Sequence, residues 1–323
     1  MGTAMAIHLA RCGQRVALWS RRDEGAAAIR RDRENRRLLP GCPLPPSVDV
    51  TADIASAAEA DALLVAVPSR FLRSQLREIA GAVPSGTPVI SVIKGIEVET
   101  FSRPSEVITQ ELGERSVCCL FGPSHAEEIA KGKPTSVVAA SSDLGWAERV
   151  QRFASNDRFR VYSSDDQVGV EWAGAMKNVM GLAAGIVDGI GYGDNAKAAL
   201  LTRAILEMQR FGEVFGADPR TFIGLAGVGD LITTCTSEHG RNLAVGRRLG
   251  QGETLEAILQ SMNGQVAEGI PTTAAIFAML AARDADAARS DLPIVAETHA
   301  VLFDGKSPRD ACDSLMRRPL KAE

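Results

Sequence analysis

A lysine and an asparagine interrupt a long run of small and apolar residues in the second half of the chain. Residues 168–188 read VGVEWAGAMKNVMGLAAGIVD, and the glycines and alanines around Lys177 and Asn178 predict a helix that approaches its neighbours very closely. An ammonium in such surroundings is largely dehydrated, which favours release of its proton. Lys177 is therefore a candidate acid for a carbonyl reduction, although a lysine on a helix is more often a solvated surface residue.

A glycine-rich segment with an acid and a guanidinium follows further along the chain. Residues 224–242 read GLAGVGDLITTCTSEHGRN, so glycines precede Asp230 and a threonine-rich turn precedes Arg241 and Asn242. Backbone N–H groups and a guanidinium are both suited to binding a phosphate. Two structural alternatives stay open, because Asp230 would also suit a helix cap and Arg241 a helix surface.

Polar residues also follow two apolar runs that read as buried strands. Lys94 follows the run PVISVI, and Gly122 and Ser124 follow the run VCCLF. In a parallel sheet the carboxyl ends of the strands deliver such residues to a ligand. Lys94 is a candidate anion contact at this edge, unless its side chain simply extends from the sheet into water.

Two different kinds of domain must position these residues. The first half of the chain alternates short apolar runs with helical patterns, which indicates βα units and a parallel sheet buried on both faces. From about residue 167 helical periodicity continues to the end. We therefore predict a doubly wound, Rossmann-like α/β domain at 1–163 and an all-α substrate and catalytic domain at 164–323. The expected strands are 15–19, 62–67, 88–93, 117–121, 136–140 and 159–162.

The start of the chain reads as the second half of a dinucleotide-binding fingerprint. Such a fold opens with a strand, the loop G-x-G-x-x-G and a helix, and the loop lets the backbone approach a pyrophosphate. Gly2 opens a helical stretch, Ala6 follows it, and Gly13 ends it before the strand RVALW. The first strand and the first two glycines are missing from this pattern. We expect about 10–15 residues upstream of Met1 to carry them.

Two arginines follow the strand RVALW, where a dinucleotide-binding site reads the adenosine ribose. An acid at this point favours the 2′-hydroxyl of NAD(H), whereas a guanidinium suits the 2′-phosphate of NADP(H). Arg21 and Arg22 therefore favour NADP(H), and the neighbouring Asp23 and Glu24 leave NAD(H) acceptable. The alternative is a basic surface loop with no role in cofactor binding.

Composition narrows the class of protein further. The net charge of −4 and the pI of about 5.7 argue against nucleic acid as the main partner. No apolar run approaches the roughly 18 residues of a membrane helix, so we expect no membrane insertion. The six cysteines show no C-x-x-C spacing, which is typical of reduced thiols in the cytoplasm. The four histidines are scattered without metal-ligand spacing, so no metal site is expected.

Four ordered segments closely resemble bacterial NAD(P)-dependent glycerol-3-phosphate dehydrogenase. They are IKGIE (93–97), GPSHAEEIAKGKPT (122–135), GAMKNVMGLAAGIVDGIGYGDNAKAALLTR (174–203) and GLAGVGDLITTCTSEHGRN (224–242). The resemblance runs from Gly2 to about residue 315. It implies reduction of dihydroxyacetone phosphate to sn-glycerol 3-phosphate with NAD(P)H, which supplies glycerophospholipid synthesis, and it makes a homodimer a reasonable expectation.

The resemblance also implies roles for individual residues. Lys177 would exchange the proton at the C2 oxygen, and Lys94 would contact both substrate and cofactor. The other implied substrate contacts are Gly122, Ser124, Asp230, Gly240, Arg241 and Asn242. The implied cofactor contacts, besides Lys94, are Met1, Gly2, Arg21, Arg22, Ala126, Arg241, Val266 and Glu268. The family usually has serine where this chain has Gly240, which removes a hydroxyl but leaves a backbone N–H for the phosphate.

Two other interpretations compete with this one. Ketopantoate reductases and 3-hydroxyacid dehydrogenases share the two-domain plan and also use lysine and asparagine on a helix after the sheet. The motif around Gly122 and Ser124, together with Arg241 and Asn242, favours a phosphorylated triose over their substrates. A non-catalytic homologue is the second competitor, because the glycine loop is truncated and Gly240 replaces the usual serine.

Overall fold

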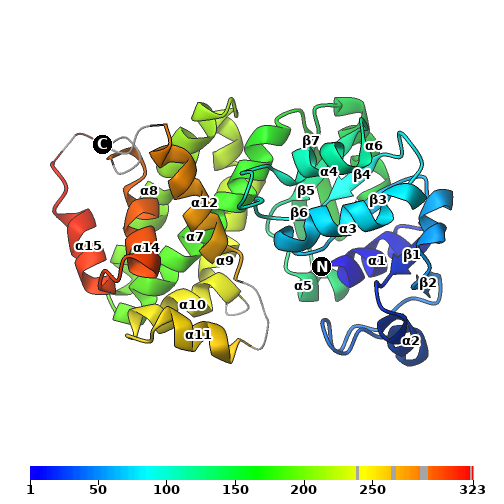
Figure 1. Cartoon of the computed structure of the whole chain (residues 1–323), viewed down its shortest axis with the longest axis horizontal. Helices are drawn as coiled ribbons and strands as arrows, with labels where there is room; N and C mark the ends of the chain where they lie inside the picture. Colours follow the sequence, from blue (N-terminus) through cyan, green and yellow to red (C-terminus); the bar gives the residue numbers. More distant parts are fainter. Residues whose placement is uncertain (238–239, 263–266, 284–289, 321, 323) are drawn as a thin grey trace. The chain divides into compact units, whose positions relative to one another are not determined.

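The computed structural model describes residues 1–237, 240–262, 267–283, 290–320 and 322. The chain forms two compact units (Figure 1). The first unit comprises Met1–Ile93 and Pro104–Gln167, and the second comprises Lys94–Arg103 and Val168–Glu323. The short segment 94–103, which begins with Lys94, therefore belongs by its contacts to the second unit, whereas the sequence suggested a single boundary near residue 163.

The first unit contains two sheets. β1 (Val16–Trp19) and β2 (Val48–Thr51) form a parallel pair. The other sheet has the order β3-β4-β5-β6-β7. Its strands are β3 (Leu63–Val65), β4 (Val89–Ser91), β5 (Val117–Phe121), β6 (Thr135–Ala140) and β7 (Phe159–Ser164). β3, β4 and β5 are parallel, and β7 is parallel to β6.

One strand direction differs from the sequence prediction. β6 runs antiparallel to β5, with Cys119 opposite Ala140 and Phe121 opposite Val138, so the parallel sheet that the sequence predicts contains one antiparallel pair. A parallel crossover needs a helix long enough to carry the chain back along the sheet. The connection here holds only α5 (Ala126–Ala130), which has five residues and spans about 7 Å. The next strand therefore returns in the opposite direction.

Helices cover the five-stranded sheet through two separate apolar clusters, as a doubly wound fold requires. The helices of this unit are α1 (Gly2–Arg11), α2 (Asp23–Asp32), α3 (Leu72–Ile79), α4 (Pro104–Leu112), α5 and α6 (Leu144–Ala154), with short turns η1 (Ile54–Glu59), η2 (Ser69–Phe71) and η3 (Ala80–Ala82). Buried Ile90 of β4 packs in one cluster with residues of α1 and α6. Its neighbour Val89 packs in another cluster with α3 and α4, because successive strand side chains point to opposite faces. The α/β prediction for this unit is confirmed.

The described part of the second unit is built from helices. They are α7 (Gln167–Ile190), α8 (Gly193–Val214), α9 (Asp230–Thr236), α10 (Arg241–Gly250), α11 (Leu255–Ser261), α12 (Gly269–Ala281), α14 (Pro293–Phe303) and α15 (Pro308–Met316), with short turns η4 (Pro219–Ile223) and η5 (Leu225–Gly229). The all-α prediction is therefore confirmed for the described residues. None of the helices that these residues form is long and apolar enough to cross a membrane.

α7 is the central helix of the second unit, and it packs on α10 through glycines. A Cβ placed on Gly185 would overlap the carbonyl oxygen of Leu243 and would lie 2.8 Å from the Cα of Gly246. Only residues without a side chain allow two backbones to come this close. The close approach that the small residues of α7 predict is therefore confirmed. Near the end of α7, Oδ2 of Asp188 forms ion pairs with Nζ of Lys197 on α8 (2.9 Å) and with Nη2 of Arg247 on α10 (3.1 Å).

Candidate active site

Lys177 lies on α7 with its ammonium turned toward α9. Its side chain is 11% exposed, and Nζ lies 3.4 Å from Oδ1 of Asp230. Nζ also donates a hydrogen bond of 2.8 Å to Oγ1 of Thr234. Asp230 and Thr234 are four residues apart on α9, which places both on the face that meets Lys177. The alternative of a solvated surface lysine is therefore wrong.

Lys94 reaches the same carboxylate from the segment 94–103. Its Nζ lies 2.6 Å from Oδ2 of Asp230, and its side chain is 15% exposed. Each carboxylate oxygen of Asp230 thus holds one ammonium, and the carboxylate itself is 3% exposed. Asp230 opens α9, but the pairing with two lysines is its main interaction. A buried cluster of two ammoniums and one carboxylate favours an anionic ligand beside it.

Burial and charge shift the protonation equilibria of this cluster. Burial is the largest cause that lowers the pKa of Lys94; attraction to Asp230 opposes it and repulsion from the Lys177 ammonium adds to it, and the net pKa is about 8. Burial alone would raise the pKa of Asp230, but the two ammoniums outweigh it and hold that pKa below its ordinary value. Asp230 is therefore ionised at neutral pH, and Lys94 is poised to change its charge in the mildly alkaline range.

Two asparagines join this cluster to the surrounding helices. Nδ2 of Asn178 donates to the backbone oxygen of Lys94 at 3.2 Å, and Oδ1 of Asn178 accepts from Nδ2 of Asn242 at 3.0 Å. Oδ1 of Asn242 in turn accepts from the backbone N–H of Gly269, also at 3.0 Å. The chain of bonds fixes the start of the segment 94–103 relative to α7, α10 and α12. Asn242 is therefore linked to the backbone of Lys94 through the side chain of Asn178.

Sequence analysis missed Asn178 and Thr234 as members of the site. Asn178 directly follows Lys177, but neighbouring residues on a helix point in different directions, so adjacency alone does not predict a shared site. Thr234 lies four residues after Asp230, a spacing that places two side chains on one helix face. That spacing was the available signal for Thr234.

The remaining expected residues of the second unit lie at helix starts or outside the described residues. Arg241 is the exposed first residue of α10, and it has no ion-pair partner in the part of the chain that the structure describes. Gly240 is the N-cap of the same helix, where a Cβ would lie 3.0 Å from the backbone oxygen of Thr234. Glu268 precedes α12 as its N-cap. Val266 lies outside the described residues.

In the first unit, Gly122 and Ser124 form a tight loop after β5. Gly122 has a φ of +145°, and a Cβ there would lie 3.0 Å from the Cα of Val137 in β6. Oγ of Ser124 donates a 2.7 Å hydrogen bond to the backbone oxygen of Gly122. Only glycine suits this backbone conformation, so Gly122 shapes the loop by having no side chain. Ala126 opens the short helix α5 just beyond it.

The start of α1 fits the pyrophosphate of a dinucleotide. The helix has ten residues, no acidic side chain in its first turn and no side-chain cap from its N-cap residue, Met1. Its first N–H groups therefore keep the partial positive charge that binds anions at helix N-termini. A Cβ on Gly2 would lie 3.3 Å from the Cβ of Ala66, just beyond β3, so glycine keeps this approach open.

The two arginines that follow β1 are both exposed, but they differ in their contacts. Arg21 forms an ion pair of 3.1 Å with Glu78. Arg22 is the N-cap of α2, and its guanidinium has no hydrogen-bond or ion-pair partner among the residues that the structure describes. Arg22 is therefore the arginine of this pair whose guanidinium is available to a phosphate.

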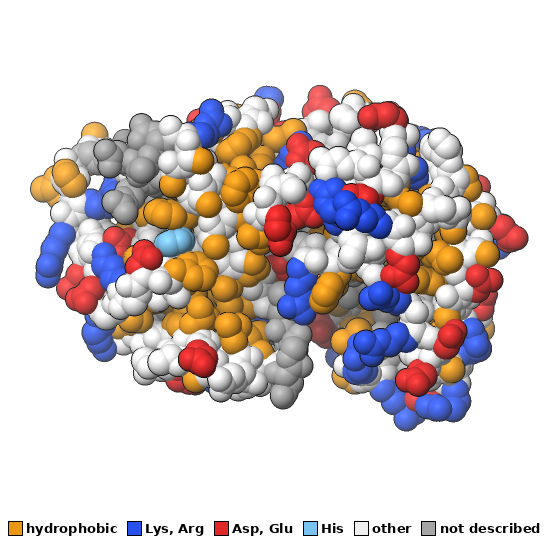
Figure 2. All heavy atoms as spheres, viewed as in Figure 1, with side chains coloured by type: hydrophobic (Ala, Val, Ile, Leu, Met, Phe, Trp, Pro, Cys, Tyr) orange, Lys and Arg blue, Asp and Glu red, His pale blue; other side chains and the backbone are white. Residues whose placement is uncertain are grey.

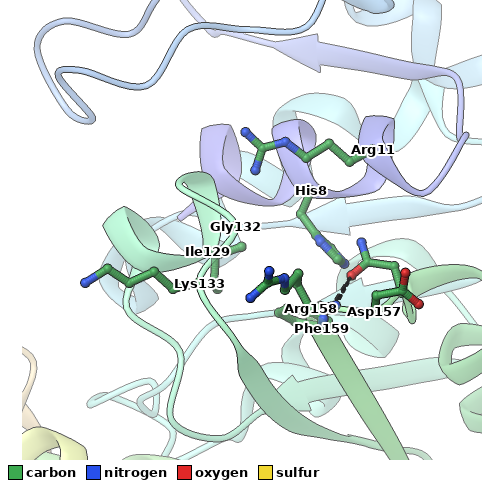
Figure 3. A pocket seen from close by; sticks show the side chains of 9 residues that line it. His8, Arg11, Ile129, Gly132, Lys133, Asp157, Arg158 and Phe159 are labelled. Carbon is green, nitrogen blue, oxygen red and sulfur yellow. Dashed lines mark hydrogen bonds between the residues drawn. The ribbon is translucent and has the colours of Figure 1, made fainter.

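A separate pocket of about 320 Å³ lies in the first unit (Figure 3). Its lining includes His8 and Arg11 of α1, Lys133, Arg158 and Phe159. The His8 ring is buried and forms a 2.7 Å hydrogen bond with the backbone oxygen of Ala154. No residue of the predicted site lines this pocket. Among the described residues, no group of three or more His, Cys, Asp and Glu side chains could hold a metal ion.

The fold and the lysine cluster together define a class of protein. The first unit is doubly wound and presents a helix N-terminus suited to a dinucleotide phosphate. The second unit is helical and carries buried ammoniums able to donate a proton and to bind an anion. This combination is that of a two-domain, nicotinamide-dependent oxidoreductase acting on an anionic carbonyl or hydroxyl compound.

Comparison with known proteins identifies the family. The model of the NAD-dependent glycerol-3-phosphate dehydrogenase N-terminus matches residues 1–147, and that of the C-terminus matches residues 166–313. The chain is 47% identical over 326 aligned positions to glycerol-3-phosphate dehydrogenase [NAD(P)+] 2 of Salinibacter ruber, covering 100% of this chain and 93% of that protein. It is 45% identical to glycerol-3-phosphate dehydrogenase [NAD(P)+] of Geobacillus thermodenitrificans, with the same two coverages.

A solved structure agrees with these relatives. The crystal structure of glycerol-3-phosphate dehydrogenase from Coxiella burnetii is 33% identical, with a TM-score of 0.90 over 98% of this chain and 95% of that one. This chain belongs to the NAD-dependent glycerol-3-phosphate dehydrogenase family. The resemblance given by its sequence motifs is confirmed, and the matches to both halves favour this family over the ketopantoate reductase and 3-hydroxyacid dehydrogenase types.

Proposed function

We propose that this chain reduces dihydroxyacetone phosphate with NAD(P)H and a proton to give sn-glycerol 3-phosphate and NAD(P)+. The observation that carries this proposal is the buried carboxylate of Asp230, which holds Lys94 at 2.6 Å and Lys177 at 3.4 Å. One ammonium supplies the proton that a carbonyl reduction consumes, while the other offers positive charge to the phosphorylated substrate.

Each residue of the site then has a role. Lys177 donates a proton to the C2 oxygen as that oxygen gains negative charge, and Asp230 orients both ammoniums. Lys94 contacts the substrate and the cofactor. The substrate phosphate is bound by Arg241 and Asn242, with Gly240, Gly122 and Ser124 as further substrate contacts. Arg241 is suited to this task because its guanidinium is exposed at a helix start.

A nicotinamide cofactor fits the residues of the first unit. When bound, it supplies the hydride that reduces C2. We propose that Gly2 and Met1 at the start of α1 hold the pyrophosphate and that Arg21 and Arg22 bind the adenosine side, Arg22 by its available guanidinium. Further contacts are expected from Lys94, Ala126, Arg241, Val266 and Glu268. The arginines favour NADP(H), with NAD(H) also used.

The proposed reaction makes a direct prediction. The purified chain should oxidise NADPH and NADH when dihydroxyacetone phosphate is added, with the higher kcat/KM for NADPH because of the arginines after β1. Loss of absorbance at 340 nm measures the rate. Ketopantoate and a 3-oxoacid serve as control substrates and should give no turnover. Turnover with a control substrate alone would assign the chain another reaction, and no turnover with any of them would support a non-catalytic homologue.

The cellular setting and the assembly are also proposals. All six cysteines are free thiols, which suits the reducing cytoplasm, where the product would supply glycerophospholipid synthesis. A homodimer is proposed as well, because apolar side chains gather on the face of the second unit around α12 and α14 (Figure 2). The mass in solution, measured by sedimentation equilibrium, tests this assembly.

The lowered pKa of Lys94 predicts a pH dependence. Its pKa is about 8, so Lys94 is charged below this pH and neutral above it. If its positive charge binds the substrate, kcat/KM for dihydroxyacetone phosphate falls as the pH rises from 7.5 to 9.5. In Lys94→Arg the guanidinium stays charged throughout this range, so the fall should disappear even if the rate is lower. If kcat/KM of Lys94→Arg still falls between pH 7.5 and 9.5, the fall reflects the titration of a group other than Lys94.

A further inference from the structure

The segment 94–103 reads KGIEVETFSR and carries Lys94 at its first position. It leaves the first unit after β4, makes its contacts in the second unit, and re-enters the first unit at α4. Such a short segment can hold an ammonium at a fixed place only if its two ends are bound firmly. We call the contacts that bind the two ends its anchors. The structure shows where those anchors lie.

The far end of the segment is anchored by a buried ion pair. Nη1 of Arg103 lies 2.9 Å from Oε2 of Glu171 on α7, and the two side chains are 15% and 1% exposed. A carboxylate this deeply buried is stable as an ion only with a partner, so the pair fixes the guanidinium against the helix. Neither residue belongs to the proposed catalytic cluster.

The near end is anchored on the same helix. Nδ2 of Asn178 donates to the backbone oxygen of Lys94. Glu171 and Asn178 are seven residues apart on α7, so they lie on one face about 10 Å from each other. The two ends of the segment are therefore bound two helical turns apart along α7, with Lys94 at one anchor and Arg103 at the other.

The stretch between the anchors is compact, so a shift at one end is transmitted to the other. Ile96 is 3% exposed and packs in the apolar core of the second unit. The backbone N–H of Glu97 donates to the backbone oxygen of Ser102 at 3.0 Å and closes a small loop. Within that loop Phe101 has a φ of +59°, a left-handed conformation that a non-glycine residue keeps only when its surroundings hold it.

We propose that Arg103 and Glu171 are a positioning pair that holds the segment 94–103 on α7 and thereby places the ammonium of Lys94 on Asp230. This inference rests on the proposed role of Lys94 in substrate binding. We expect the pair to act on the reaction through Lys94, because Arg103 and Lys94 are the two ends of one short segment and both ends are bound to α7.

A double replacement by apolar residues tests the pair without leaving a buried charge. Arg103→Met combined with Glu171→Met removes both charges at similar volume, a change that buried ion pairs often tolerate. We expect kcat/KM for dihydroxyacetone phosphate to fall about tenfold to a hundredfold, a loss of the kind that a misplaced binding group produces. Arg103→Lys, which keeps a cation for Glu171, should recover most of the activity. In a Lys94→Met background the same double replacement should cost less than twofold, because the group it positions is gone.

A control and a second measurement make the outcome decisive. Arg73→Met in the first unit breaks an ion pair with Glu111, in which the side chains are 20% and 10% exposed, and should leave kcat/KM within twofold. Amide hydrogen exchange followed by mass spectrometry reports on the segment without any turnover, and residues 94–103 should exchange at least tenfold faster in the double variant. Unchanged exchange would overturn the proposal even if the chain proves inactive. Equal losses of activity with and without Lys94 would reduce the pair to a general structural role.

Discussion

Replacing Lys177 with methionine is expected to lower kcat for the reduction of dihydroxyacetone phosphate by about 10²–10⁴-fold, the usual contribution of a positioned general acid. The Lys177 ammonium is held beside Asp230 and Thr234, where it is the proposed donor of the proton to the C2 oxygen. Methionine keeps the apolar stem, so α7 should keep its packing. Asp230 would still be paired with Lys94, and the fold should survive. Steady-state kinetics with circular dichroism as a check on folding measures both effects.

Lys197 provides the matched control for this experiment. It is also a lysine of the second unit, its side chain is 17% exposed, and it forms an ion pair of 2.9 Å with Asp188. Lys197→Met therefore removes an ammonium of similar burial and pairing that has no place in the proposed chemistry. Its kcat should stay within about threefold of the parent. If both variants lose activity equally, the loss reflects damage to the helical unit, and Lys177 would no longer be the proposed acid.

The outcome at individual residues shows which features of the fold a sequence can predict. The run VCCLF predicted the strand 117–121, because a continuously apolar run between turn signals suits a strand buried on both faces. β2 was missed because VDVT is short and follows a proline-rich loop. The predicted direction of β6 was wrong because it depends on the length of α5. The length of a helix in such a short connection is poorly predicted by the periodicity of apolar residues.

The three charged residues of the cluster could be singled out from the sequence, but their arrangement could not. The types of Lys94, Lys177 and Asp230 indicated an anion site and a proton donor. Their meeting at a single carboxylate depends on contacts between residues up to 136 positions apart, which periodicity does not encode. The same reason explains why the segment 94–103 was assigned to the first domain. It is contiguous with β4 in sequence, but Asn178 and Glu171 hold it in the second unit.

The glycines of α7 lead to the largest expected effect on stability. Replacing Gly185 with alanine should lower the free energy of unfolding by about 3 kcal/mol, because the added methyl group meets backbone atoms that cannot rotate away. Its Cβ would overlap the carbonyl oxygen of Leu243 and lie 2.9 Å from the backbone nitrogen of Arg247. α7 and α10 must separate to accept it. The melting temperature should fall by roughly 10 °C, as thermal denaturation would show.

Gly81 separates this steric effect from the general consequences of replacing glycine. It lies in η3 of the first unit, is exposed, and a Cβ there would have no atom within 4 Å. Gly81→Ala should leave the melting temperature unchanged or raise it slightly, because alanine restricts the unfolded chain. Gly185→Ala should also reduce kcat, since α7 carries Lys177 and α10 begins with Arg241 and Asn242. Equal melting temperatures for the two variants would mean that α7 and α10 can move apart at little cost, and the lysine cluster would then depend on its own ion pairs for its geometry.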